Sequence, residues 1–79
     1  MKAKVNGIRT ARIASEHIKL SALLKLMSVA MSGGEAKILI QSGEVFVGGE
    51  PCTQRGKKIR PGDVVRYGGC TIVVKAENK

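Results

Sequence analysis

The spacing of apolar residues changes at Gly43, and this change limits the possible folds more than any other feature of the sequence. Before Gly43, two stretches repeat at the spacing of a helix, and after it apolar and polar residues alternate as in a strand. The apolar face of the first predicted helix comprises Leu23, Leu24, Met27, Ala30 and Met31, and that of the second comprises Ala36, Leu39 and Ile40. The sequence therefore predicts an α+β domain in which two helices pack on a small antiparallel β-sheet.

Capping residues set the ends of the two predicted helices. Ser21 precedes the stretch ALLKLMSVAM and is suited to be the N-cap of the first helix. Ser32, with Glu35 three residues later, fits a capping box at the start of the second helix. The two glycines that follow Ser32 are predicted to form the turn between the helices, and Gly43 is predicted to end the second helix.

Glycine pairs and one proline divide the second half of the chain into short strands. Gly48-Gly49 and Gly68-Gly69 suit tight hairpin turns, and Pro61-Gly62-Asp63 is a turn in which proline presets φ. The predicted strands are 45–47, 64–67 and 71–75, and a further strand is expected within residues 11–20. We expect one domain, 1–79, whose first twelve residues form a basic arm or, alternatively, a short first strand.

The excess of positive charge points to a polyanionic partner. Fourteen Lys and Arg residues against six Asp and Glu give a net charge of +8. Such a density attracts nucleic acid, an acidic protein or an anionic membrane surface. Phe46 and Tyr67 are the only aromatic residues, too few for a platform on which bases stack. We therefore expect recognition of the phosphate backbone and of shape.

Other function classes find little support in the sequence. No apolar run approaches the ~20 residues of a membrane span, and no secretory signal is visible, so we expect a cytoplasmic protein. Cys52 and Cys70 are expected to be reduced thiols, with a disulfide as the alternative if they lie on neighbouring strands. One histidine, His17, cannot complete a metal site, and nothing places it near a nucleophile. We expect no metal, no cofactor and no catalysis.

The ordered motifs of residues 18–65 resemble a known family. These motifs are a leucine-rich first helix, SGGEAK, LIQSGEVFV, RGKK and PGDVV. Together they resemble the S-four RNA-binding domain, named for small-subunit ribosomal protein four, and above all its short stand-alone bacterial group typified by YaaA and YbcJ. The resemblance implies the alpha-L RNA-binding motif, in which two helices and nearby loops bind structured RNA, with the family-like core at 18–75. Gly33 stands where many members of the family carry an arginine.

The candidate RNA contacts lie on a loop and on the helices. Four cations and Gly56, which allows close approach of a phosphate, fall within residues 55–60, and no acid lies between Glu50 and Asp63. The alternative for this loop is incidental, solvated charge, and that for the start of the second helix is a capped turn. The candidate RNA-binding residues are Lys19, Lys25, Ser32, Gly33, Gly34, Lys37, Gln41, Arg55, Gly56, Lys57, Lys58 and Arg60. Lys2, Lys4, Arg9 and Arg12 are expected to add an electrostatic arm.

The sequence thus predicts a monomeric, non-catalytic protein of translation that binds structured RNA, either ribosomal or transfer RNA, with the ribosome as a partner. Two alternatives stay open. One is a protein-interaction module that docks on an acidic ribosome-assembly or replication factor. The other is DNA binding.

Overall fold

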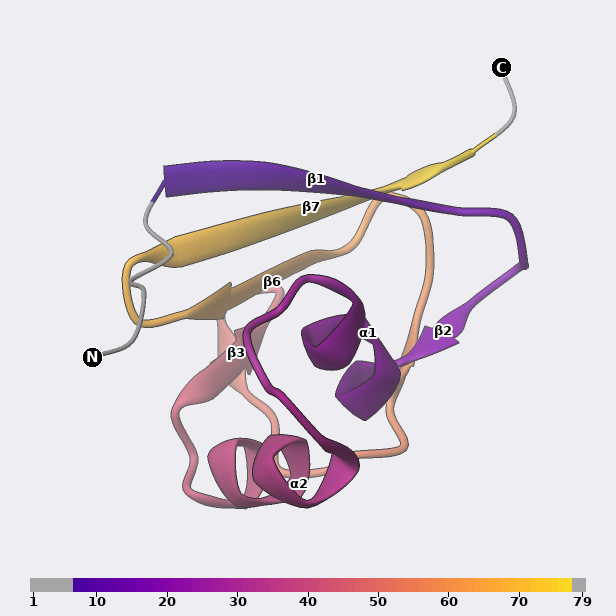
Figure 1. The fold of residues 1–79 in the computed structure, drawn as a ribbon. Helices are drawn as coiled ribbons and strands as arrows, with labels where there is room; N and C mark the ends of the chain where they lie inside the picture. The colour runs from indigo at the N-terminus through magenta and orange to yellow at the C-terminus, as the bar shows by residue number, and fades with distance from the viewer. Residues whose placement is uncertain (1–6, 78–79) are drawn as a thin grey trace.

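The computed structural model describes residues 7–77 (Figure 1). The strands are β1 (Gly7–Ile13), β2 (Ile18–Lys19), β3 (Val45–Val47), β4 (Glu50–Pro51), β5 (Lys58–Ile59), β6 (Val64–Tyr67) and β7 (Cys70–Ala76), and the helices are α1 (Leu20–Leu26) and α2 (Gly33–Gln41). The predicted order of two helices followed by short strands is confirmed. Lys2 and Lys4 of the expected basic arm lie outside the described residues.

Among the described residues 7–77, the main sheet has five strands in the order β1-β7-β6-β3-β4, and β2 and β5 form a separate pair. β6 is antiparallel to both β3 and β7, as predicted. The prediction of an antiparallel sheet is wrong at one edge, where β1 runs parallel to β7. Parallel strands need a long connection, and here residues 14–69 connect β1 to β7, so the two strands can pair in parallel. Figure 1 shows both helices on one side of the β1–β7 layer.

The core fills the space between the helices and this face of the sheet. Leu20, Leu23 and Leu24 of α1, together with Ala36 and Ile40 of α2, are fully buried. Alternate strand residues meet them, since successive side chains of a strand point to opposite faces. These strand residues are Ala11, Ile13, Val45, Val65, Cys70, Ile72 and Val74, and Ile59 of β5 joins the same core.

Part of the expected basic arm is a strand. Gly7–Ile13 pairs with Cys70–Ala76 over its whole length, and Ala11 and Ile13 are buried. The arm prediction is therefore wrong for residues 7–12, and the alternative of a first strand is correct. Burial of alternate apolar side chains and the backbone hydrogen bonds to β7 outweigh the mutual repulsion of Arg9 and Arg12.

α1 differs from its predicted boundaries at both ends. It starts one residue after Lys19, whose side chain makes no capping bond, and Ser21 lies inside the helix. At the other end, Ser28 takes a left-handed φ of 62°, which stops the helix. The amides of Val29 and Ala30 then both donate to the Leu24 carbonyl. Met31, predicted to lie on the buried face, is therefore 85% exposed.

α2 begins at the predicted capping residues. The Ser32 hydroxyl accepts the Glu35 N–H at 3.2 Å, and the Glu35 carboxylate accepts the Met31 N–H at 2.6 Å. Gly33 and Gly34 form the first turn of α2 rather than the link between the helices, so that prediction is wrong. At the other end, Gly43 has a φ of 85° and follows the C-cap, as predicted.

Candidate nucleic-acid interface

The cationic loop between β4 and β5 is tied to the start of α1. The N–H of Leu20 donates to the Lys57 carbonyl at 2.9 Å, and the N–H of Ser21 donates to the Arg55 carbonyl at 3.1 Å. Two of the N–H groups that every helix leaves unpaired at its start thus find partners in this loop. The backbone of Arg55 and Lys57 is fixed against α1 while both side chains remain exposed.

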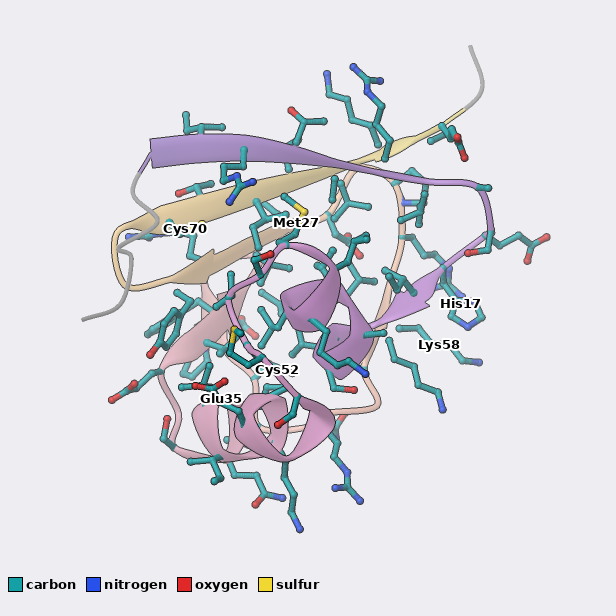
Figure 2. All side chains as sticks on the ribbon, viewed as in Figure 1. His17, Met27, Glu35, Cys52, Lys58 and Cys70 are labelled. Carbon is teal, nitrogen blue, oxygen red and sulfur yellow. The ribbon has the colours of Figure 1, made fainter. Side chains whose placement is uncertain are left out.

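The β2–β5 pair brings two more cations together. Ile18 lies opposite Ile59, and Lys19 lies opposite Lys58. Because Ile59 is fully buried, the pleat turns Lys58 away from the core, and Lys19 is exposed as well. Figure 2 shows Lys58 and His17 on the side of the molecule that carries β2. Like charges directly opposite in a ladder repel one another, so this pair favours a bound anion.

Lys25 extends this cationic region along α1. It is exposed in the last turn of the helix, four residues after Ser21 and therefore on the same face. The hydrogen bond from the Ser21 N–H places the Arg55 backbone at the N-terminal end of the helix that carries Lys25. We call Lys19, Lys25, Arg55, Lys57 and Lys58 the loop–helix surface.

α2 packs against α1, the helix that carries Lys25. Lys37 and Gln41 are exposed and four residues apart, as predicted. The hydroxyl of Ser32 is occupied by the cap. A Cβ on Gly33 would meet no atom within 4 Å, and one on Gly34 would meet only the Ser32 hydroxyl at 3.9 Å. Neither glycine has a positive φ, so the fold does not require glycine at either position.

The remaining loop candidates differ in their surroundings. Gly56 is exposed, with open space around its Cα. Arg60 lies in the turn before β6, where its N–H donates to the Asp63 carboxylate at 2.8 Å. Asp63 thus places a negative charge beside the Arg60 backbone. We therefore expect Arg60 to attract phosphate less strongly than Lys57 or Lys58 does.

The two cysteines are free thiols, as expected. Cys70 lies on β7, whose neighbours are β1 and β6, whereas Cys52 follows β4, so the disulfide alternative is wrong. Burial raises the pKa of the Cys70 thiol, and the nearby Arg9 guanidinium offsets part of that rise. Among residues 7–77, no three His, Cys, Asp or Glu side chains gather where they could hold a metal ion. Within the same residues, neither helix is long and apolar enough to cross a bilayer.

Comparison with known proteins identifies the family. Residues 11–75 match the family model described as "S4 domain". The chain belongs to the S4 domain family. It is 46% identical over 57 residues to "Probable ribosome maturation protein RlbA" of Bacillus subtilis (strain 168), covering 72% of this chain and 80% of that protein. It is 40% identical over 60 residues to "Putative RNA-binding protein YbcJ" of Escherichia coli (strain K12), covering 76% of this chain and 86% of that protein. The resemblance to the short YbcJ-like group is confirmed.

Sequence reasoning did not predict the exposure of Met31 and Ile38, two of the exposed apolar residues among residues 7–77 of this S4 domain. Ile38 is 68% exposed and lies beside Lys37 on the outer side of α2, and Met31 directly precedes the Ser32 cap. The helical spacing already placed Ile38 away from Ala36 and Ile40, so the signal for its exposure was present. For Met31 no such signal existed, since only the left-handed Ser28 takes it out of the α1 register.

Proposed function

We propose that this S4 domain is a non-catalytic, cytoplasmic and monomeric protein that binds structured RNA through the loop–helix surface and the exposed face of α2. The observation that carries the proposal is the pair of backbone hydrogen bonds that fixes the cationic loop to the start of α1. Family membership supports RNA binding. The name of the Bacillus subtilis relative favours ribosomal over transfer RNA as the target.

In this proposal, the cations bind phosphates, and their fixed spacing on the protein matches the spacing of phosphates on an RNA helix. Lys19 and Lys58 share one phosphate or two adjacent ones, because the ladder holds them opposite each other. Arg55 and Lys57 bind phosphates further along the same RNA strand, and Gly56 between them lets the RNA backbone come close. Such contacts position RNA by its backbone rather than by base sequence.

The start of α2 has a different role from the loop. Its positive end already holds the Glu35 carboxylate, which repels a phosphate. We therefore assign Lys37 and Gln41, one turn or more into the helix, to direct RNA contact. Gly33 and Gly34 carry no side chain that would obstruct the approach of RNA to Lys37, and Ser32 contributes by fixing the first turn.

Replacing Gly34 with alanine separates the effect of this residue on the stability of α2 from its effect on RNA binding. We expect the free energy of unfolding to rise by about 0.5 kcal/mol, because alanine favours the helix and its Cβ has room. We expect RNA affinity to fall at least about threefold, because the new methyl group obstructs the approach of RNA to Lys37. Urea unfolding and filter binding measure the two effects. An affinity that stays unchanged would remove Gly34 from the interface.

Salt dependence tests the proposed function as a whole. If the five cations of the loop–helix surface neutralise about five phosphates, the logarithm of affinity should fall against that of salt with a slope of roughly −3.5 to −4.5. Fluorescence anisotropy with a folded ribosomal RNA fragment gives this slope. Binding that is indifferent to salt contradicts the proposal.

Two controls address DNA and protein partners. Duplex DNA of equal length, used as a competitor at the same salt, should displace the RNA poorly, because its B-form backbone has a different shape. In a pull-down, ribosomal proteins should be lost after ribonuclease treatment if RNA provides the contact.

A further inference from the structure

β1 is an edge strand, and the hydrogen bonds at its two ends show which of its backbone groups face away from the sheet. The N–H of Gly7 donates to the Gly69 carbonyl at 2.9 Å, and the N–H of Glu77 donates to the Ile13 carbonyl at 2.7 Å. In a parallel ladder only every second residue of a strand bonds to a given neighbour. The continuous register from Gly7 to Ile13 therefore turns the N–H and C=O groups of Ile8, Thr10 and Arg12 outward.

Within residues 7–77 no strand pairs with the outer side of β1, and this edge is suited to accept another strand, whereas the opposite edge is not. β1 has seven residues, no proline and an uninterrupted register with β7. β4, at the other edge, has two residues and ends in Pro51. Short length, proline and charged side chains are devices that prevent a sheet edge from pairing further. β1 has neither of the first two, and its charged residues, Arg9 and Arg12, are cations that oppose pairing with a second copy but not with an acidic strand. Its outward residues are exposed, Ile8 by 76%.

The charges at this edge select an acidic occupant. Arg12 lies opposite Lys75 in the register, and both side chains are exposed. The Arg9 guanidinium does not join this pair, because it donates to the Met27 carbonyl at 3.5 Å. Arg12 and Lys75 outnumber the carboxylate of the exposed Glu77 at this end of the ladder, so the site keeps a net positive charge that attracts further carboxylates. A second copy of this chain, with its own net charge of +8, would instead be repelled.

We propose that β1 binds an extended acidic segment of a partner protein as a sixth strand of the main sheet. The main chain of the segment pairs with Ile8, Thr10 and Arg12, and one of its carboxylates lies beside Arg12 and Lys75. This goes beyond the proposed RNA binding and uses no residue of the loop–helix surface. The domain then holds RNA with its helical side while the sheet edge holds a protein strand.

A synthetic peptide tests the proposal. The probe is the blocked peptide Thr-Glu-Thr-Val-Thr-Glu-Thr, which presents a carboxylate near Arg12 in either strand direction. Its control carries Lys in place of both Glu residues. We expect the acidic peptide to shift and protect the backbone amides of Ile8, Thr10 and Arg12, with the control binding at least about fivefold more weakly.

Two substitutions at the edge complete the test. Thr10→Pro removes one outward N–H without touching the bonds to β7, and should weaken peptide binding at least about tenfold. Thr10→Val keeps that N–H and should leave binding within about twofold. Arg12→Glu changes an exposed residue and should weaken binding of the acidic peptide at least about fivefold. This variant replaces Thr10→Pro in the test if the proline variant fails to fold. RNA affinity of Thr10→Pro should stay unchanged, so this test is independent of the proposed function.

Several outcomes overturn the proposal. These are equal peptide binding by Thr10→Pro and Thr10→Val, amide shifts on α2 or the loop instead of β1, and no peptide binding at millimolar concentration. Concentration-dependent shifts of the β1 amides in the protein alone would assign the edge to a second copy. Shifts of the same amides with folded RNA would assign it to nucleic acid.

Discussion

The combined change of Arg55, Lys57 and Lys58 to glutamate should abolish binding to structured RNA at physiological salt. Each replacement turns a cation into an anion, so the net charge falls by six from +8 to +2. Loss of three phosphate contacts and the new repulsion should lower affinity on the order of 100-fold or more. The fold should persist, because these side chains are exposed and the loop carbonyls that bind α1 are unchanged.

A second triple variant provides the matched control. Arg12, Arg66 and Lys75 are exposed cations of the strands, and their change to glutamate lowers the net charge by the same amount. We expect this variant to lose less than about tenfold in affinity, through general electrostatics alone. Both affinities are measured by anisotropy with one folded RNA at one salt concentration. Equal losses in the two variants would show that net charge, and not the loop–helix surface, determines binding.

Replacing Leu24 with alanine should lower the free energy of unfolding by about 3 kcal/mol. Leu24 is fully buried in the core, and its carbonyl accepts the N–H groups of Val29 and Ala30 that end α1. The substitution leaves a cavity that the surrounding core cannot close. In a domain of this size, the loss corresponds to a fall in Tm of roughly 12–24 °C.

Leu26→Ala is the control for this prediction. Leu26 lies in the same helix but is 56% exposed, so its truncation should cost less than about 0.5 kcal/mol. Urea unfolding followed by circular dichroism gives both values. Comparable losses would contradict the assignment of Leu24 to the core and Leu26 to the surface.

The sequence predicted the features that depend on neighbouring residues. The change of apolar spacing at Gly43 separated helices from strands, and Ser32 with Glu35 predicted the start of α2. The turns at Gly48-Gly49 and Gly62 have the positive φ values that glycine favours. Each of these signals acts within a few residues and can therefore be read from the chain alone.

Features that depend on distant residues were missed. The start of α1 was placed at Ser21 because a local cap was expected, whereas carbonyls from the loop at 55–57 supply the partners. The parallel pairing of β1 with β7 joins opposite ends of the chain and leaves no local signal. The cations of the loop were identified, but their connection to Lys19 through the β2–β5 pair was not.

The most direct test of the account is a titration of the ¹⁵N-labelled protein with a folded ribosomal RNA hairpin, followed by the shift of each backbone amide. RNA binding through the loop–helix surface and α2 should give the largest shifts at Lys19, Lys25, Lys37, Gln41 and residues 54–58. Unfolded RNA of equal length should produce weaker shifts. Shifts spread evenly over the molecule, or confined to the strands of the main sheet, would contradict RNA binding through that surface.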